Sequence, residues 1–360
     1  MSFPKLFCGA AAAVCLMLQG CATSTTATAY VSNADSREIS VLELNKREGT
    51  LRSLQTVSVG GTAMPLALSP DQKKLYVALR SEPYTAAAFT IDATTGQLSP
   101  LGSAALPDSM ANIATDRSGR WLFAASYGGH RASVSPIDAA GKPAAAVQIV
   151  PNGKNAHAAI PDAANRNVYI TSLGTDQVLQ WRFDAATGQL TPNDPPAMAA
   201  RPGSGPRHLV FHPNGRHAYL LGELDASVEL LEVDAAKGQL SRKQHWSTLP
   251  AGFTGKPWAA DLHLTPDGRF LYTSERTSST LAIWRVDAGS GALTLVGHQA
   301  TEQQPRGFQI DSSGQWLMAA GQLSHSVTLY RIDPDNGRLS QAQRVPVGKG
   351  PNWIEIVDRP

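Results

Sequence analysis

A four-part repeat recurs along almost the whole chain, and no other feature of the sequence limits the fold as strongly. One copy occupies residues 209–240: an apolar strand, a His-Pro-Asn-Gly turn, a strand rich in Tyr and Leu, and an alternating strand that ends at a Gly-containing turn. The next copy occupies residues 262–293, with a Thr-Pro-Asp-Gly turn. Short alternating segments between turn residues are typical of antiparallel strands. The repeat therefore predicts a series of small antiparallel sheets.

The repeat length identifies the kind of sheet assembly. The turns between the first and second strands are marked by Pro70, Asp116, Pro161, Pro213, Pro266 and Asp311. Successive markers are about 45 to 53 residues apart, which is the length of one four-stranded β-propeller blade. A hydrophobic content of 42% over 360 residues is typical of a globular domain of this size. No helical segments separate the strands, which excludes an α/β barrel.

The two ends of the chain complete the repeat. Residues 350–358 copy the innermost strand of residues 205–213, but no blade follows them. Residues 29–32 copy a second strand, at 218–221. We therefore expect the C-terminal strand to join three N-terminal strands in a shared last blade, which closes the ring without an open edge. The prediction is an all-β, seven-bladed β-propeller over residues 28–360.

The first twenty residues have the pattern of a secretory signal peptide. Lys5 precedes an apolar segment, residues 6–18, that is too short to span a bilayer. The Leu-Gln-Gly-Cys sequence that ends at Cys21 resembles a bacterial lipobox, which implies cleavage before Cys21, lipidation there, and a tether over residues 21–27. We expect an exported lipoprotein that faces the periplasm and touches the membrane only through this lipid. An ordinary signal peptide with a chance cysteine is the alternative.

Composition limits the chemistry. The three cysteines are Cys8, Cys15 and Cys21, so the propeller itself has no cysteine nucleophile, disulfide or zinc knuckle. A formal net charge of +2 gives no basic field for nucleic acid. The chain also has no nucleophile elbow, no His-Glu-x-x-His motif and no phosphate-binding Gly-Lys-Ser/Thr loop. Any catalytic group must come from elsewhere in the repeat.

The repeat predicts where a site lies. In each blade the first strand starts, and the second strand ends, at the same mouth of the central channel. The tenth residues after the six turn markers are Arg80, Ser126, Thr171, Glu223, Arg276 and Gly321. Near the starts of the first strands stand His157, Arg207, His208, Asp261, His263 and Arg306. Half-buried charges are costly unless they are paired or used, so we expect a functional cluster at this mouth. A merely structural Arg207–Glu223 ion pair is the alternative.

Several segments in different blades resemble the propeller-type bacterial 6-phosphogluconolactonases. These segments are residues 205–213, 258–268, 304–308 and 319–325, and the resemblance covers nearly everything after the tether. It implies a seven-bladed propeller that acts on a lactone with no metal and no other cofactor. It also implies a catalytic centre made of His157, Arg207, Glu223 and Arg276. From their place near the mouth we expect substrate binding by Arg80, His208, Asp261, His263 and Arg306.

The resemblance implies hydrolysis of a sugar lactone, either glucono-1,5-lactone or its 6-phosphate. We expect the protein to be a monomer. Arg207 and Arg276 would stabilise the oxyanion. Glu223 and His157 would act as base and acid, in an order that the sequence leaves open. One alternative is a cyclase that forms a lactone from a muconate, because arginines also suit dicarboxylates. Another is a non-enzymatic envelope propeller that binds a partner through an apolar patch.

Overall fold

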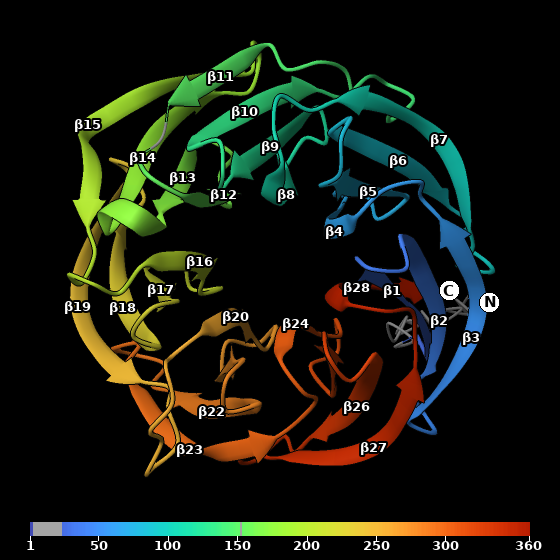
Figure 1. The fold of residues 1–360 in the computed structure, drawn as a ribbon. Coiled ribbons are helices and arrows are strands. Elements are labelled where there is room, and N and C mark those ends of the chain that lie inside the picture. The colour runs from blue at the N-terminus through green and yellow to red at the C-terminus, as the bar shows by residue number, and fades with distance from the viewer. Residues whose placement is uncertain (3–23, 152) are drawn as a thin grey trace.

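The structure, a computed structural model, describes residues 1–2, 24–151 and 153–360. Within these ranges the chain forms 28 strands in seven four-stranded antiparallel sheets, arranged as blades around a common axis (Figure 1). The same residues include no helix that is long and apolar enough to cross a membrane. Most of the predicted signal peptide, together with Cys21, lies outside the described residues. The all-β, seven-bladed prediction is confirmed.

Six blades are continuous in sequence, and each is named here by its innermost strand. The β4 blade consists of β4 (Ala63–Leu68), β5 (Lys74–Leu79), β6 (Thr85–Ile91) and β7 (Leu98–Ala105). The β8 blade consists of β8 (Met110–Thr115), β9 (Trp121–Ser126), β10 (Arg131–Pro136) and β11 (Gln148–Pro151). The β12 blade consists of β12 (Ala156–Pro161), β13 (Asn167–Ser172), β14 (Gln177–Asp184) and β15 (Gln189–Ala199), with a 3-10 turn, Leu173–Thr175, after β13.

The next three blades follow the same order. The β16 blade consists of β16 (Pro206–Phe211), β17 (His217–Gly222), β18 (Ser227–Asp234) and β19 (Gln239–Ser247). The β20 blade consists of β20 (Ala259–Leu264), β21 (Phe270–Glu275), β22 (Thr280–Val286) and β23 (Leu293–Ala300). The β24 blade consists of β24 (Pro305–Ile310), β25 (Trp316–Gly321), β26 (Ser326–Ile332) and β27 (Leu339–Pro346).

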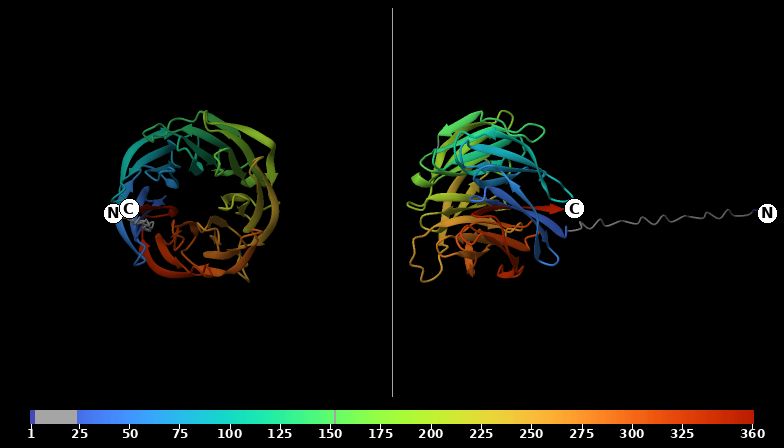
Figure 2. Two further views of the ribbon diagram at one scale, coloured as in Figure 1. Left: turned by 180° about the vertical axis from the view of Figure 1, so that it is seen from behind. Right: turned by 45° about the vertical axis from the view of Figure 1, so that its right-hand side comes forward.

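The seventh blade is built from both ends of the chain, as predicted. The C-terminal strand β28 (Pro351–Arg359) is innermost, followed by β1 (Thr26–Asn33), β2 (Glu38–Asn45) and β3 (Thr50–Ser58). In Figure 1 the red β28 lies beside the blue β1, and their register pairs Thr26 with Arg359. Figure 2 shows β28 ending at one face of the ring, so β1 begins at that face too. Strand β1 starts within the segment expected to be tether.

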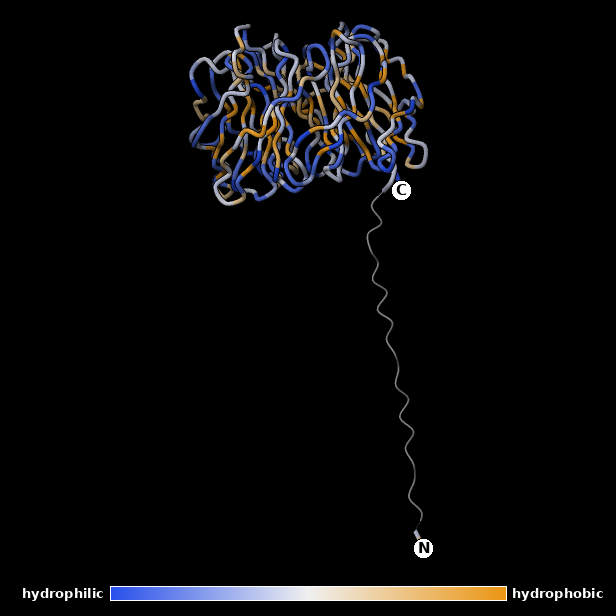
Figure 3. Tube along the Cα trace, turned by 90° about the horizontal axis from the view of Figure 1, so that it is seen from below, coloured by the Kyte–Doolittle hydropathy of each residue, from blue (hydrophilic) through white to orange (hydrophobic). Residues whose placement is uncertain are grey.

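Apolar side chains fill the space between neighbouring blades rather than the axis. Seven buried clusters each combine residues from two adjacent blades. Figure 3 shows hydrophobic segments inside the ring wall and hydrophilic loops at both faces. In four blades a buried tyrosine of the second strand donates to a glycine carbonyl in the next blade, from Tyr30, Tyr76, Tyr219 and Tyr272. Blade position is thus fixed by both burial and hydrogen bonds.

Asn352 connects the closing blade to its neighbour. Its side chain is fully buried, and Nδ2 lies 3.1 Å from the carbonyl oxygens of Ser32, Ala63 and Gly350. Because Ala63 begins β4, this amide links β28, β1 and the β4 blade. The contact therefore secures the joint where the ring closes.

We predict that Asn352→Ala destabilises the whole ring. Its buried carbonyl partners would lose their shared donor, which costs roughly 1–3 kcal/mol. Thermal unfolding measures the effect. Asn336→Ala is the matched control, because Asn336 lies in a partly exposed turn and its Nδ2 bonds only Asp333 there. Equal melting temperatures for wild type and Asn352→Ala would contradict this account of closure.

Candidate active site

Every innermost strand has an irregular pairing near its start. In each, one extra residue interrupts the register with the second strand. The first residues at these irregularities are Met64, Ala111, His157, Arg207, Ala260, Arg306 and Asn352. A β-bulge re-aims a side chain out of the regular alternation, and bulges are frequent beside active sites. The bulges therefore place one histidine and two arginines at the same level of the ring.

We call the face where innermost strands begin the entry face. The second strands end there, and the structure corrects the register predicted for these ends. Each intervening turn opens at a residue whose amide donates to the carbonyl five residues later, namely Ser69, Asp116, Asp162, His212, Thr265 and Asp311. Two of the markers used in the sequence are turn-opening residues, and the other four are prolines next to one. Counting ten residues from every marker therefore reached different structural positions in different blades.

The corrected ring differs from the predicted one at three places. In the six continuous blades, the residue after the second strand is Arg80, Tyr127, Leu173, Glu223, Arg276 or Gln322. The placement of Ser126, Thr171 and Gly321 in this ring was therefore wrong, because they are the last or second-last residues of their strands. Arg80, Glu223 and Arg276 keep their predicted equivalence. Tyr127 was missed, and counting from the turn-opening residue would have found it.

Glu223 is held between two arginines. Its Oε2 lies 2.7 Å from Nε of Arg207 and 3.1 Å from Nη2 of Arg276. Both arginine side chains are 1% exposed. The Nε1 of Trp258 donates to Oε1 of the same carboxylate over 3.3 Å. The four side chains come from two neighbouring blades, so this cluster forms only when those blades are in place.

Trp258 also covers the second arginine. The guanidinium carbon of Arg276 lies 3.8 Å from the centre of the indole ring, which is a cation–π contact. Arg276 donates from Nε to the carbonyl of Trp258 and from Nη2 to that of Ala259. Trp258 itself remains 40% exposed. It lies in a segment that resembled the lactonase family, but its role depends on contacts that the sequence does not show.

The charges in this cluster determine the protonation states of Glu223 and Arg276. Burial alone would raise the pKa of Glu223, but the charges of Arg207, Arg276 and Arg306 outweigh burial and hold that pKa below its usual range. Burial and the charge of Arg207 lower the pKa of Arg276 to about 9, against the opposing effect of Glu223. At neutral pH the cluster is therefore an ionised carboxylate between two guanidinium cations.

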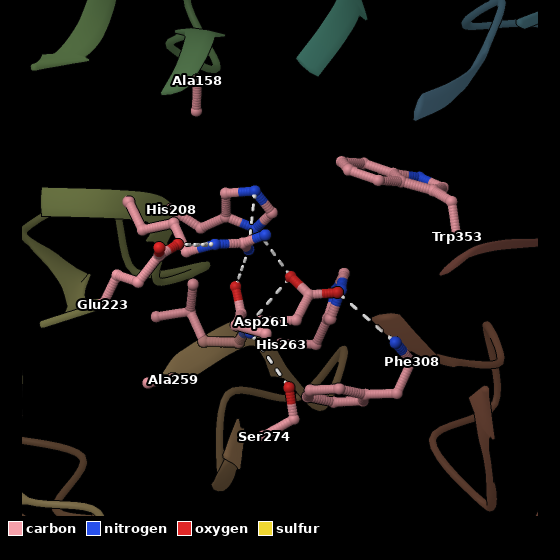
Figure 4. Close-up of polar contacts among 12 residues, drawn as sticks. Ala158, His208, Glu223, Ala259, Asp261, His263, Ser274, Phe308 and Trp353 are labelled. Carbon is pink, nitrogen blue, oxygen red and sulfur yellow. Dashed lines mark hydrogen bonds and ion pairs between the residues drawn. The ribbon is translucent and has the colours of Figure 1, made fainter. Parts of the chain in front are cut away.

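A second buried network lies directly behind the first. His208 Nδ1 is 2.8 Å from Oδ1 of Asp261, and His263 Nε2 is 3.3 Å from Oδ2 (Figure 4). On its other side, His208 Nε2 lies 3.2 Å from Nη1 of Arg207. Burial and the charge of Arg207 lower the pKa of His208 to about 4, although Asp261 opposes this. His208 is therefore neutral at physiological pH.

His157 faces this cluster from the β12 blade. Its ring centre is 5.1 Å from that of His208 and 6.0 Å from that of Tyr127. The side chain is buried, and Nδ1 has no hydrogen-bond partner among the described residues. Burial, followed by the charges of Arg207, His208, Arg306 and Arg276, lowers the pKa of His157 well below its usual value. A neutral imidazole with an unused nitrogen is thus enclosed among cations.

Two further arginines extend the positive charge of the entry face. Arg80 donates from Nε to Ser109 Oγ over 2.9 Å. Arg306 is half-buried, and within residues 24–151 and 153–360 it makes no hydrogen bond or ion pair. Burial, with the repulsion of Arg207, Arg276 and Arg80, lowers the pKa of Arg306. Four arginines thus act electrostatically on one another near Glu223, which leaves an excess of positive charge.

These features define the class of protein as a seven-bladed propeller whose entry face gathers cations, neutral histidines and two carboxylates. Such an arrangement can stabilise developing negative charge on an oxygen and accept a proton nearby. Residues 20–356 match the family described as "Lactonase, 7-bladed beta-propeller", and the chain belongs to this family. It is accordingly a propeller lactonase.

Curated relatives and solved structures agree with this assignment. The chain is 42% identical to a 6-phosphogluconolactonase of Pectobacterium carotovorum over 328 residues, which are 91% of this chain and 98% of the relative. It is equally similar, at 42% over 327 residues, to a 6-phosphogluconolactonase of Yersinia pestis, with 91% of this chain and 97% of the relative covered. The structure of the Pseudomonas aeruginosa periplasmic gluconolactonase PpgL superposes with a TM-score of 0.87 at 28% identity, covering 93% of this chain and all of that one.

We predict that His157 makes stability depend on pH. Its folded-state pKa is depressed, so as pH falls through about 6.5 the unfolded chain binds a proton that the folded protein does not, and stability falls. His208 acts in the same direction, whereas the raised pKa of His263 acts in the opposite one. The substitution His157→Phe removes the effect of His157 and keeps those of His208 and His263. Its melting temperature should therefore depend less on pH than that of wild type.

Melting temperatures between about pH 8 and pH 5 measure this difference. The control is His245→Phe, since His245 is an exposed residue of the outermost strand β19. It should show the pH dependence of wild type. Equal slopes for wild type and His157→Phe would contradict a neutral, buried His157.

Proposed function

We propose that the protein hydrolyses a sugar lactone, glucono-1,5-lactone or its 6-phosphate, to the aldonic acid at the entry face. The observation that carries this proposal is Glu223 held between Arg207 and Arg276, each of which keeps donor groups for a ligand. The names of the relatives, 6-phosphogluconolactonase and periplasmic gluconolactonase, support the substrate class. The sequence-based alternatives of a cyclase and a non-enzymatic propeller gain no specific support.

The arginines bind the lactone carbonyl and stabilise the oxyanion. Among the described residues, Nη2 of Arg207 and Nη1 of Arg276 make no hydrogen bond, while their other nitrogens are engaged. A carbonyl oxygen that becomes negative as water adds would bind these two donors more strongly than the ground-state carbonyl does. Glu223 fixes both guanidinium groups, so they need no reorganisation during the reaction.

His157 is the better placed of the two proton acceptors. Glu223 already accepts from three donors, so its carboxylate oxygens are engaged. His157 is neutral at physiological pH and has an unused ring nitrogen. It would take the proton from the attacking water and return it to the ring oxygen as the C–O bond breaks. The base and acid steps then need only one side chain.

The excess of positive charge suits a lactone that carries phosphate. Arg306 has no ion-pair partner among the described residues, and Arg80 is held by neutral groups, Ser109 and Met64. A phosphate dianion would be stabilised by such uncompensated guanidinium groups. Wild type should therefore be assayed on both lactones, with correction for spontaneous hydrolysis. Failure to accelerate either would contradict the proposed function.

We predict that Arg207→Ala loses lactonase turnover by about 10²- to 10³-fold, the scale of removing one oxyanion donor. Arg207→Lys should recover little, because a point charge cannot replace a planar fork. Rates and thermal stability are measured together. Arg242→Ala is the matched control, since Arg242 pairs with the buried Glu229 between the outer strands β18 and β19 of the same blade. The control should lose stability and keep turnover, and the same behaviour in Arg207→Ala would contradict its catalytic role.

We also propose that the protein is an exported lipoprotein anchored through Cys21 and working in the periplasm. The periplasmic gluconolactonase PpgL is a precedent for such a location in a similar structure. Strand β1 begins at Thr26, on the face opposite the entry face. Five residues reach at most roughly 18 Å, so the anchor would hold that opposite face close to the membrane. The entry face would then point into the aqueous compartment.

We predict that Cys21→Ser releases the protein from membranes without changing its fold. Attached acyl chains contribute about 0.8 kcal/mol per buried methylene, and this variant removes all of them. Membrane and soluble fractions after a salt wash are compared by immunoblot, with lactonase rate as the control for folding. Retention of Cys21→Ser in the membrane fraction would contradict the lipid anchor.

A further inference from the structure

Asp261 occupies the centre of a buried network that joins three blades. Its side chain is 8% exposed. The carboxylate accepts from His208 at 2.8 Å, from His263 at 3.3 Å, and from the backbone amides of Leu262 and Phe308 at 3.0 and 3.4 Å. These partners belong to the β16, β20 and β24 blades (Figure 4). With its acceptor sites occupied in this way, Asp261 has little capacity left to contact substrate.

The carboxylate selects the tautomer of His208. Burial would raise the pKa of Asp261, but the two histidines hold it well below its usual range, so Asp261 is an ionised acceptor. Nδ1 of His208 must then carry the hydrogen that Asp261 accepts. Since His208 is neutral, its Nε2 has no hydrogen and can only accept.

The acceptor nitrogen of His208 meets the proposed oxyanion donor. Nη1 of Arg207 lies 3.2 Å from Nε2 of His208 and also donates to the carbonyl of Ala260. Nε of Arg207 is bonded to Glu223 at 2.7 Å. Three contacts therefore fix the plane of the guanidinium and leave Nη2 without a hydrogen bond among the described residues. The opposite tautomer of His208 would turn an N–H toward Nη1 and repel it.

We propose that Asp261 is a positioning residue that aims the Arg207 guanidinium at the lactone carbonyl by fixing the tautomer of His208. This inference rests on the proposed function, and it replaces direct substrate binding as the role of Asp261 and His208. The hydrogen-bond sequence from Asp261 through His208 to Arg207 spans two blades, so it also couples the site to their relative position.

A double-mutant cycle tests the proposal. Asp261→Asn keeps the shape, but its amide can donate to Nδ1 and so allow the other tautomer. We expect kcat to fall by roughly 10- to 100-fold, the scale of a misplaced catalytic group, with KM little changed. In the Arg207→Ala background the same substitution should have almost no effect on kcat, because the group it positions is gone. Additive losses would overturn the proposal.

Glu302→Gln is the matched control for damage to a buried carboxylate. Glu302 is 4% exposed and accepts from Arg344, Ser324, Ser326 and Thr328, none of which is a candidate site residue. It should lower the melting temperature and leave kcat unchanged in both backgrounds. If Asp261→Asn does not fold, His208→Phe takes its place in the cycle, because it keeps the ring that contacts His157 and Trp353 and removes the acceptor.

Nitrogen-15 NMR of labelled histidine provides a readout that does not depend on activity. In wild type, His208 should show a protonated Nδ1 and an unprotonated Nε2, and Asp261→Asn should change this pattern. The opposite tautomer in wild type would overturn the proposal even if lactones are hydrolysed. A protein that shows the expected tautomer but hydrolyses no lactone would instead contradict the proposed function alone.

Discussion

The pairing of β28 with β1 is the constraint on which the site depends. Eight residues of β1 are in register with β28, and Asn352 extends this joint to the next blade. The candidate groups come from four blades: His157 from β12, Arg207 from β16, Asp261 from β20 and Arg306 from β24. Each of these strands contributes one of the groups, so the groups meet only when the blades are placed side by side. Closing the ring fixes the blade angles, and the blade angles bring the groups into contact.

Burying these charged groups together is unfavourable and lowers the stability of the folded protein. Two nearly fully buried arginines share one carboxylate, and Arg306 adds a further charge without a partner among the described residues. Burying charge costs several kcal/mol per ion unless geometry is very good, and well-packed apolar residues are often more stable. The apolar clusters between the blades stabilise the ring, so its stability does not require an ion pair near the axis. An expensive cationic centre is therefore better explained by ligand chemistry than by structure.

The sequence predicted the architecture well because the repeat pattern directly indicates the number and order of the blades. Turn residues at regular spacing and the copied strands at residues 29–32 and 350–358 were sufficient for seven blades and shared closure. The site was predicted less completely. The bulges that re-aim His157 and Arg207 leave no mark in the strand pattern. The ring contact of Trp258 and the tautomer of His208 depend on distances between blades, which no local pattern encodes.

The central claim is that the Glu223 cluster performs lactone hydrolysis rather than merely holding two blades together. The most direct test compares Glu223→Gln with Glu229→Gln, because Glu229 is also a buried glutamate paired with an arginine, Arg242. Melting temperature and kcat/KM on the preferred lactone are measured for both. We expect both variants to lose stability, and only Glu223→Gln to lose kcat/KM, by about 10²-fold or more. Folded Glu223→Gln with turnover equal to that of the control would contradict the account.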